Sequence, residues 1–507
     1  MRTPLAEVAA WVGQPISLAG PAAEVVVTGV ASSSRSVVPG DVYVAPAGAT
    51  THGARFATDA VAAGAVAVLT DPEGARLCRA AGVTVPVIVS PKPRDVVGTL
   101  AARVYGNPAD DLRLFAVTGT QGKTTTTRLL EAALLAVGQR AAVIGTVGTR
   151  IDGEDVRTAL TTPEAADLHA LFAVMRERGT TTCAMEVSSH ALVMGRVDGV
   201  VFDVAAFTNL GRDHLDFHTD MEDYFAAKAL LFTPARSRRA LVNVDDPYGR
   251  RLAGSAGIPV RTFSATGAPA GWRAVDLRAT ATGTTFLARG PQGDHEVRLR
   301  LPGDFNVANA LCALAGATEL GFDPAVVAAG LGEVAGVPGR LEPVDAGQGF
   351  LAVVDYAHKP DALTAVLQAL RSRTAGRLLL VIGAGGDRDR GKRPLMGEVA
   401  ARLADVLVVT DDNPRTEDPA AIRAEVLAGA TGSQAEVHEV GDRREAIRLA
   451  VSLATDGDCV IVAGKGHETG QEAAGVVTPF DDRVQLREAL AAHTAGTAHR
   501  PGPVVRR

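Results

Sequence analysis

Val117-Thr-Gly-Thr-Gln-Gly-Lys-Thr-Thr125 decides the fold at the centre of this 507-residue chain. The apolar run Leu114-Phe-Ala-Val-Thr118 predicts a strand before it, and a helix is predicted after it to about Val137, where Gly138 ends it. A glycine-rich turn at a helix N-terminus binds phosphate through backbone N–H groups, a lysine neutralises the terminal phosphates, and a threonine hydroxyl ligates Mg²⁺. The predicted phosphate-binding residues are therefore Gly119, Thr120, Gln121, Gly122, Lys123, Thr124 and Thr125. Valine at 117 departs from the common spacing, and the alternative is a glycine-bearing turn with an exposed lysine.

Composition and charge place the chain among ordinary globular proteins. Hydrophobic residues make up 47%, and the net charge of -6 lacks the basic excess that nucleic acids or acidic membranes would require. The first 20 residues do not fit a signal peptide, and the apolar runs are shorter than the roughly 18 residues that span a bilayer. We expect a cytoplasmic protein without membrane insertion, whose partners are small molecules.

The four cysteines lie far apart in the sequence, which favours neither a disulfide framework nor a zinc site. Cys78, Cys183, Cys312 and Cys459 are expected to be buried thiols.

Short apolar runs alternate with helical stretches, which is typical of α/β domains with largely parallel sheets. We predict units at 1–110, 111–338 and 339–493, and a disordered tail at 494–507. Four strands are predicted in the third unit, at 352–355, 378–382, 406–409 and 459–463, each followed by a polar or glycine-rich cluster. Since ligands bind beyond the carboxyl ends of parallel strands, these clusters are expected at one functional edge.

Three further residues in the second unit suggest chemistry. Glu186 ends a predicted strand and His214 follows another, so both could reach the phosphate-loop edge as Mg²⁺ ligands, although a structural histidine is the alternative. Lys228 interrupts the apolar face of a helix that begins after a capping box at Thr219-Asp-Met-Glu222. A buried ammonium must be paired, depressed in pKa or chemically modified, unless the side chain snorkels to solvent.

Several motifs together carry a family resemblance over nearly the whole chain. They are Thr118-Gly-Thr-Gln-Gly-Lys-Thr-Thr125, Glu186-Val-Ser-Ser-His190, Thr208-Asn-Leu-Gly-Arg-Asp-His-Leu-Asp216, Asn306-Val-Ala-Asn309, Gly339-Arg-Leu-Glu342 and Asp355-Tyr-Ala-His358. In this order they resemble the Mur ligase family. The resemblance implies an α/β, three-domain architecture with a central phosphate-loop parallel-sheet domain and a Rossmann-like C-terminal domain.

The same resemblance implies an ATP-dependent ligase that activates a carboxylate as an acyl phosphate and joins it to an amino acid. It implies that Lys123, Glu186, His214 and Lys228 are catalytic, that two Mg²⁺ ions are held by Thr124, Glu186, His214 and a carbamylated Lys228, and that Asn306, Arg340 and Asp355 contact ATP. A monomer is expected. His358 is a further candidate for positioning or proton transfer.

Gly385-Gly-Asp-Arg-Asp389, Asp412-Asn-Pro-Arg415 and Gly464-Lys-Gly-His-Glu468 resemble the family members that add diaminopimelate to a UDP-N-acetylmuramoyl-dipeptide. The implied diaminopimelate set is Arg388, Asp412, Asn413, Pro414, Arg415, Gly464 and Glu468; an arginine suits bidentate capture of a carboxylate. For Asp412–Arg415 the alternative is a plain turn, because Asn-Pro favours turns.

For the nucleotide-sugar peptide the resemblance implies Ser34 and Thr50 at the UDP end, and Thr161, Thr162, Ser188 and Arg196 at the peptide end. Ser33, Ala49, Gln121 and Met194 depart from the familiar family pattern. The rival functions are a lysine-adding or folylpolyglutamate-type amide ligase and a phosphate-loop NTPase that acts as a motor or switch. The first would lack the arginine at 415, and the second would leave the clusters of the third unit without a ligand.

Overall fold

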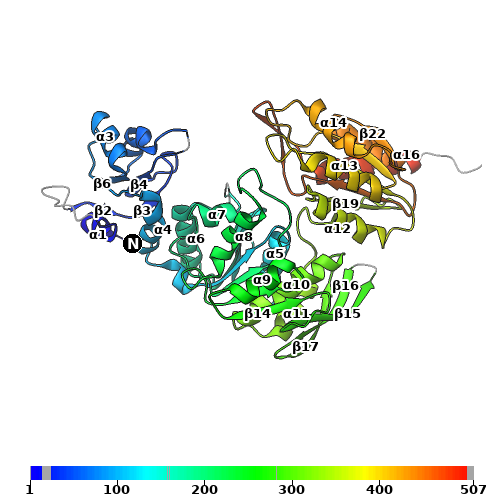
Figure 1. The fold of residues 1–507 in the computed structure, drawn as a ribbon, viewed down its shortest axis with the longest axis horizontal. Helices are drawn as coiled ribbons and strands as arrows, with labels where there is room; N and C mark the ends of the chain where they lie inside the picture. Colours follow the sequence, from blue (N-terminus) through cyan, green and yellow to red (C-terminus); the bar gives the residue numbers. More distant parts are fainter. Residues whose placement is uncertain are drawn as a thin grey trace, which may run out of the picture.

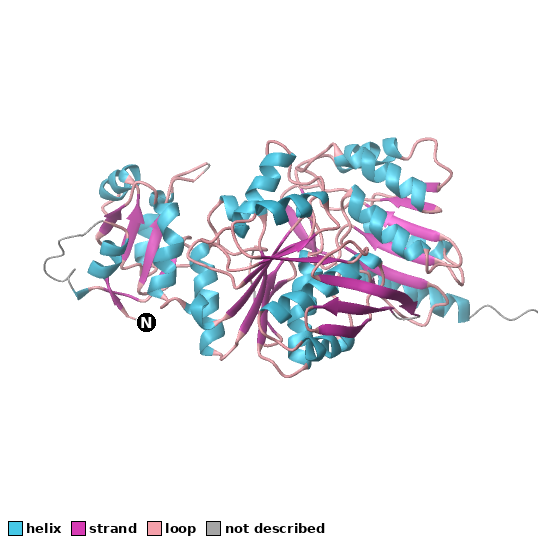
Figure 2. Ribbon diagram, turned by 60° about the horizontal axis from the view of Figure 1, so that its bottom comes forward, coloured by secondary structure: helices cyan, strands magenta, loops and turns pink. Residues whose placement is uncertain are grey.

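The computed structural model describes residues 2–13, 24–48, 50–156, 158, 160–280 and 283–498. Three α/β units follow one another along the chain, and the middle unit lies between the other two (Figure 1). In Figure 2 helices flank the strands in all three.

The first unit consists of β1 (Thr3–Pro4), α1 (Leu5–Trp11), β2 (Val26–Val27), β3 (Gly29–Ala31), β4 (Asp41–Ala45), η2 (Gly53–Phe56), α2 (Ala57–Ala62), β5 (Ala67–Thr70), α3 (Pro72–Ala80), β6 (Val87–Val89) and α4 (Pro93–Val104). Strands β3-β4-β5-β6 form a parallel sheet, and β1 pairs with β2 antiparallel. Every residue of β4 is buried, as expected for an inner strand of a sheet covered on both faces.

The middle unit consists of η3 (Pro108–Asp111), β7 (Arg113–Thr118), α5 (Lys123–Ala136), β8 (Ala141–Gly145), β9 (Gly148–Ile151), β10 (Glu154–Val156), α6 (Ala165–Glu177), β11 (Thr182–Glu186), α7 (Ser189–Val193), β12 (Val204–Phe207), α8 (Met221–Ala229), η4 (Leu230–Phe232), β13 (Ala240–Asn243), α9 (Pro247–Ser255), β14 (Val260–Ser264), β15 (Trp272–Thr280), β16 (Gly283–Gly290), β17 (Gly293–Leu299), α10 (Asp304–Glu319) and α11 (Pro324–Glu333).

These strands form one sheet of order β10-β9-β8-β11-β7-β12-β13-β14-β15-β16-β17. Its centre, from β8 to β15, is parallel, and the antiparallel pairings of β9 and β10 at one end and of β16 and β17 at the other extend it. Helices α5, α10 and α11 pack on one face through Leu129, Leu311 and Leu331. Helices α6, α8 and α9 pack on the other through Phe172, Tyr224 and Leu252, so the phosphate loop leaves a part of the sheet that is covered on both faces.

The third unit consists of β18 (Glu342–Pro343), β19 (Leu351–Asp355), α12 (Pro360–Arg371), β20 (Leu378–Ile382), α13 (Lys392–Leu403), β21 (Val406–Val409), α14 (Pro419–Gly429), β22 (Glu436–Glu439), α15 (Arg443–Leu453), β23 (Cys459–Ala463), β24 (Gly470–Ala473), β25 (Val476–Pro479) and α16 (Asp482–Ala498). The sheet order is β18-β19-β23-β20-β21-β22, parallel except for β18. Helices α12, α13 and α14 cover one face, and α15 and α16 the other. Strands β24 and β25 form a separate hairpin.

The predicted α/β class with parallel sheets is confirmed, and the strands predicted in the third unit coincide with β19, β20, β21 and β23. Helix α16 continues over residues 494–498, where the disordered tail was predicted to begin, and the rest of that tail, 499–507, lies outside the described residues. All four cysteines are buried and free, as predicted. In the described part of the chain, no helix is both long and apolar enough to cross a bilayer.

The capping of α8 differs from the prediction. The side chain of Asp220, not that of Thr219, accepts the hydrogen bond from the backbone N–H of Asp223. The carboxylate of Asp223 then accepts from the backbone N–H of Thr219. Aspartate is as good an N-cap as threonine, so the helix starts one residue later than the predicted box implied.

Candidate functional site

The phosphate loop connects β7 to α5. Gly119 and Gly122 have φ values of 149° and 85°. A side-chain carbon at these positions would lie 1.9 Å from Thr208 Oγ1 and 2.4 Å from Asn309 Oδ1, so only glycine fits. Lys123 folds back and donates to the carbonyl oxygens of Gly119 and Thr120 at 2.7 and 3.2 Å. Burial lowers the pKa of Lys123 to about 8. The lysine is therefore held in a loop built to receive an anion.

The candidate metal ligands each have a protein partner. Glu186 accepts hydrogen bonds from the backbone N–H and the hydroxyl of Thr146 at 2.8 and 2.9 Å. His214, at φ 54°, lies with Nε2 3.0 Å from Asp213 Oδ2. No group of three or more His, Cys, Asp or Glu side chains arranged for a metal occurs in the part of the chain that the structure describes. Of the four predicted metal ligands, only Glu186 and His214 are residues of these types, and two of them do not make such a group. Their metal-binding role therefore stays a prediction.

Lys228 is buried, with 1% of its surface exposed, so the snorkelling alternative is wrong. Its ammonium donates to Gly119 O at 3.1 Å and lies 4.4 Å from the ring centre of Tyr224. Burial, reinforced by the nearby Lys123, lowers the pKa of Lys228 well below its ordinary value. A carbonyl and an aromatic ring are weak compensation for a buried cation, which favours the neutral amine.

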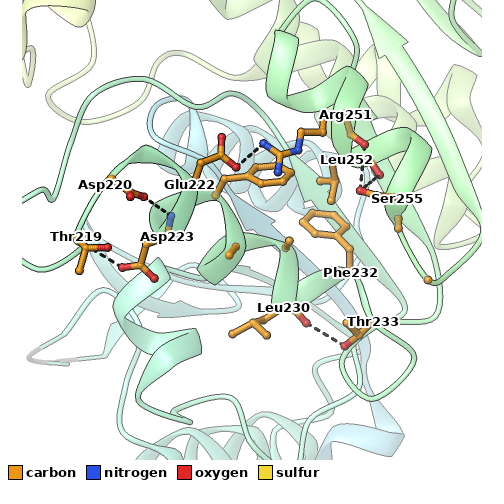
Figure 3. Close-up of a pocket in the computed structure, with 15 residues that line it drawn as sticks. Thr219, Asp220, Glu222, Asp223, Leu230, Phe232, Thr233, Arg251, Leu252 and Ser255 are labelled. Atoms are coloured by element: carbon orange, nitrogen blue, oxygen red, sulfur yellow. Dashed lines mark hydrogen bonds and ion pairs between the residues drawn. The ribbon is translucent and has the colours of Figure 1, made fainter.

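One cavity of about 990 Å³ joins several of the predicted groups. The loop residues from Thr120 to Thr125 line it, and the other predicted site residues around it are Thr161, Thr162, Glu186, Ser188, Arg196, His214, Arg340, Asp355, His358 and Arg388. The middle and third units therefore share this cavity. A second hollow of about 690 Å³, between α8 and α9, is lined by none of the predicted site residues (Figure 3).

The residues predicted for the peptide end of the nucleotide-sugar surround the end of β11. Thr161 Oγ1 lies 3.2 Å from Thr146 Oγ1, and the Thr162 hydroxyl donates to Glu186 O at 2.9 Å. Ser188 caps α7, and Arg196 forms an ion pair of 2.9 Å with Glu164. Ser34 and Thr50, predicted for the UDP end, lie in loops of the first unit and do not line the cavity.

Of the three residues predicted to contact ATP, Arg340 contacts the phosphate loop, whereas Asp355 and Asn306 form hydrogen bonds with backbone groups. Arg340 crosses from the third unit and donates to Thr124 Oγ1 at 3.1 Å. Asp355 instead accepts from the backbone N–H groups of Leu341 and Ala357, both at 2.7 Å, which makes it a support for the chain around Arg340. Asn306 donates to Pro302 O at 2.7 Å and does not line the cavity.

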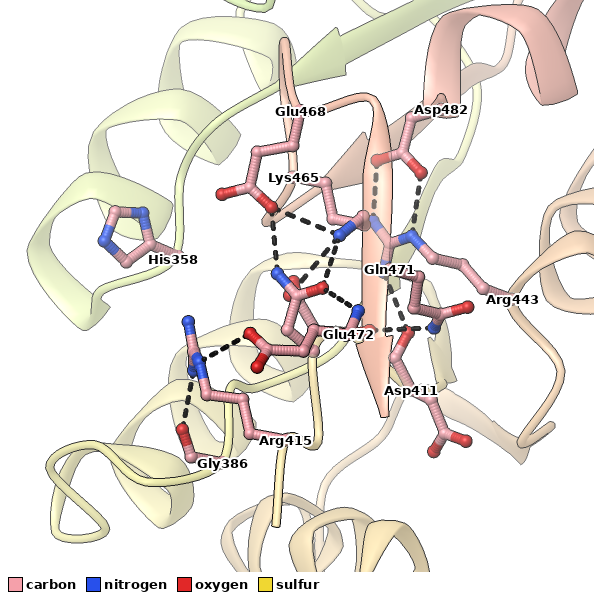
Figure 4. A network of polar contacts seen from close by, with 12 residues as sticks. His358, Gly386, Asp411, Arg415, Arg443, Lys465, Glu468, Gln471, Glu472 and Asp482 are labelled. Atoms are coloured by element: carbon pink, nitrogen blue, oxygen red, sulfur yellow. Dashed lines mark hydrogen bonds and ion pairs between the residues drawn. The ribbon is translucent and has the colours of Figure 1, made fainter. Parts of the chain in front are cut away.

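Apart from Arg388, which follows β20, the residues predicted for the amino acid follow the carboxyl ends of β21 and β23; Figure 4 shows Arg415 and Glu468 among them. Arg415, at φ 52°, donates through Nη1 to Gly386 O at 2.6 Å and lies with Nε 3.4 Å from Glu472. Asn413 donates to Glu468 Oε2 at 2.9 Å.

The remaining members of that set differ in exposure. Asp412 and Pro414 are buried, whereas Arg388 is exposed at the cavity. Gly464, at φ 113°, leaves no room for a side-chain carbon, which would lie 2.6 Å from Asp412 Oδ2. The set therefore comes together on one edge of the third sheet, and Arg388 connects it to the cavity.

Several contacts between the middle and third units were not predicted, and three of them involve the loops around the cavity. Lys359 pairs with Asp213, His467 Nε2 lies 3.2 Å from Thr146 O, and Arg212 lies 3.8 Å from Asp389. The signal for Lys359 was its rarity, since it is one of six lysines and directly follows His358. His358 is itself half-buried, with Nδ1 2.7 Å from Tyr356 O, and desolvation lowers its pKa well below the ordinary value.

Comparisons with protein families cover most of the chain. A model described as "Mur ligase middle domain" matches residues 117–317, "Mur ligase, glutamate ligase domain" matches 339–466, and "Mur ligase family, catalytic domain" matches 26–105. The three matches fall on the three units seen in the structure.

Individual relatives are similar over nearly their whole length. The UDP-N-acetylmuramoyl-L-alanyl-D-glutamate–2,6-diaminopimelate ligase of Streptomyces avermitilis is 55% identical over 96% of both chains. That of Corynebacterium glutamicum is 53% identical over 89% of both. A solved structure of a ligase of this name is 37% identical, covers 97% of this chain and all of its own, and has a TM-score of 0.68. MurF from Acinetobacter baumannii, 19% identical over 92% of this chain and 96% of its own with a TM-score of 0.65, shares the fold.

Proposed function

The chain belongs to the Mur ligase family, and from this membership and the geometry of the site we propose that it joins diaminopimelate to the D-glutamate carboxylate of UDP-N-acetylmuramoyl-L-alanyl-D-glutamate. The proposed reaction consumes ATP and passes through an acyl phosphate, in peptidoglycan precursor synthesis. The observation that carries the proposal is the shared cavity, in which the phosphate loop faces Arg340 and Arg388 of the unit that holds Arg415.

Lys123 is assigned to the transferred phosphate. Among the described residues its ammonium donates only to carbonyls of its own loop, and burial makes that arrangement poor for a cation. An anionic phosphoryl group would be a better partner, and the fixed ammonium would stabilise charge that develops on the phosphoryl oxygens. Arg340, which contacts Thr124, would complete the site from the third unit.

The oxygen donors at the loop fit Mg²⁺. Thr124 supplies a hydroxyl and Glu186 a carboxylate, and His214 would contribute an imidazole. Carbamylation of Lys228 would replace an unfavourable buried cation by an anionic oxygen donor, and the neutral amine that burial favours is the form that reacts with CO₂. When bound, two Mg²⁺ ions would neutralise phosphate charge.

The acceptor side of the proposal assigns carboxylate recognition to the guanidinium of Arg415. Its Nε and Nη1 already face Glu472 and Gly386, which fixes the plane of the group before the acceptor binds. Glu468 and Asp412 suit an ammonium. His358, held by Tyr356, is assigned to positioning or proton transfer near the reacting amine.

Ser34 and Thr50 are proposed for the UDP end, and Thr161, Thr162, Ser188 and Arg196 for the muramoyl-peptide end. Since Ser34 and Thr50 lie outside the cavity, the nucleotide-sugar would have to extend from the first unit to the end of β11. The proposal includes the domain division 1–110, 111–338 and 339–493, a monomer, and a cytoplasmic location.

Phosphate release from ATP by the purified protein tests the function. The assay contains Mg²⁺ and UDP-N-acetylmuramoyl-L-alanyl-D-glutamate, and compares meso-diaminopimelate, LL-diaminopimelate and L-lysine. Release should require the nucleotide-sugar and a diaminopimelate. Equal use of lysine would point to the lysine-adding function, and release indifferent to both cosubstrates would point to an NTPase.

A further inference from the structure

Lys465 is a cation for which the proposed reaction has no role. It is one of six lysines in the chain, directly follows Gly464 after β23, and has 0% of its surface exposed. A lysine is almost never fully buried unless it is paired. Its surroundings therefore indicate what it does.

The ammonium of Lys465 lies near three residues of the amino-acid set, of which Glu468 is labelled in Figure 4. It donates to Asn413 Oδ1 at 3.0 Å and to Glu468 Oε2 at 3.2 Å, and lies 3.9 Å from Asp412 Oδ1. Lys465 therefore lies behind the groups assigned to the acceptor.

These contacts determine how the amide of Asn413 is turned. An ammonium has only donors, so the atom of Asn413 that faces it must be the oxygen. The backbone N–H of Glu472 donates to the same oxygen at 2.9 Å, which fixes the same orientation. The amide nitrogen of Asn413 is then left to donate to Glu468 Oε2 at 2.9 Å.

The same contacts hold the carboxylate of Glu468. Its Oε2 accepts from both Asn413 and Lys465, whereas its Oε1 makes no hydrogen bond with the described residues. About a third of the Glu468 side chain is exposed, so Oε1 is the atom available to a ligand. Lys465 is the cation that lies near the carboxylates of both Glu468 and Asp412. The nearby Arg443 would not replace it, because Arg443 already pairs with Asp482.

We propose that Lys465 is a positioning residue for the amino-acid acceptor. It does not touch the acceptor, but orients the Asn413 amide and the Glu468 carboxylate so that Glu468 Oε1 faces the ammonium of the acceptor. This inference rests on the proposed function, since it takes Asn413 and Glu468 as the groups that bind the acceptor.

The test is Lys465→Met in the full chain, with steady-state kinetics for all three substrates and calorimetric titration of the acceptor. The KM and Kd of the acceptor should rise about 10- to 100-fold, because removal of a partner from a buried charged group has a cost in this range. The KM values for ATP and the nucleotide-sugar should stay within about 2-fold of wild type. Lys92→Met, which removes an exposed lysine of the first unit, is the matched control.

A mutant cycle separates positioning from a general structural role. In an Asn413→Ala/Glu468→Gln background, Lys465→Met should change acceptor affinity by less than about 2-fold, because the groups it orients are gone. An unchanged acceptor KM in the single variant, an equal rise of all three KM values, or a full effect in that background would each overturn the proposal.

If Lys465→Met does not fold, Lys465→Met/Glu468→Gln is compared with Glu468→Gln alone, since this pair removes opposite charges together. The double variant should still bind the acceptor more weakly, because Asn413 loses one of the two donors that orient its amide; equal binding would overturn the proposal. Wild-type protein without acceptor-dependent phosphate release would refute the proposed function itself, whereas an active wild type with an unaffected variant would refute only the role of Lys465.

Discussion

Replacing Lys228 with methionine should stabilise the middle unit while abolishing ligase activity. The lysine is fully enclosed, and its ammonium has one carbonyl partner, Gly119 O at 3.1 Å, and the ring of Tyr224. Methionine has a similar length and fills the same space without a charge. Since a poorly compensated buried polar group costs about 1 to 3 kcal/mol, the variant should gain up to that amount in CO₂-free buffer at pH 7.

The gain should depend on pH in a defined direction. Burial lowers the pKa of Lys228 in the folded protein below its unfolded value, so the unfolded chain binds more protons between the two values. The destabilisation by Lys228 is therefore largest at low pH and disappears as the pH rises to the unfolded pKa. The stability difference between Lys228→Met and wild type should narrow from pH 7 to pH 10.

Trp272 provides the assay, because it is fully buried in the middle sheet. In a Trp11→Phe background its fluorescence reports thermal unfolding of this unit, and about 1 to 3 kcal/mol corresponds to a rise of roughly 2 to 12 °C in Tm. Added bicarbonate should raise the Tm of the protein that carries Lys228 but not that of the variant. A variant that is less stable than its parent at pH 7 without CO₂ would show that Lys228 is well paired, and would refute the reasoning.

Three other substitutions or conditions test separate parts of the site. Arg415→Lys should lower kcat/KM for diaminopimelate about 10- to 100-fold in the phosphate-release assay, because a point charge does not reproduce bidentate geometry, and an unchanged preference over lysine would contradict the assignment. Arg443→Met should lower the free energy of unfolding, measured in urea, by about 3 to 5 kcal/mol, since Arg443 and Asp482 form a fully buried pair at 2.7 Å. A decrease of less than about 1 kcal/mol would show that Asp482 finds another partner. Binding of ATP in Mg²⁺-free buffer should weaken above pH 8, because Lys123, with a pKa of about 8, loses its charge there. Lys123→Arg is measured beside the wild type as the control. A wild-type Kd that does not change with pH would argue against the binding of phosphate by the Lys123 ammonium.

Local sequence patterns were sufficient for the elements that carry the chemistry. The phosphate loop, the strand before it and the helix after it were predictable because glycines that only fit at positive φ stand between a β-type apolar run and a helical one. The four inner strands of the third unit's six-stranded sheet were predictable for the same reason, since inner parallel strands are continuous apolar runs. Lys228 was recognisable as unusual because it interrupts an apolar helix face.

The sequence by itself determined these local elements and their order, and through its motifs the family to which the chain belongs. Tertiary structure alone decided which side chains meet across the units, because those contacts join residues more than a hundred positions apart: Arg340 with Thr124, His467 with Thr146, and Lys359 with Asp213. It also decided that Asp355 supports the backbone, and that Lys465 is buried beneath Asn413 and Glu468. Periodicity reports which face of an element is apolar, but the partner of a polar side chain depends on how whole sheets and hairpins pack, which no local pattern encodes.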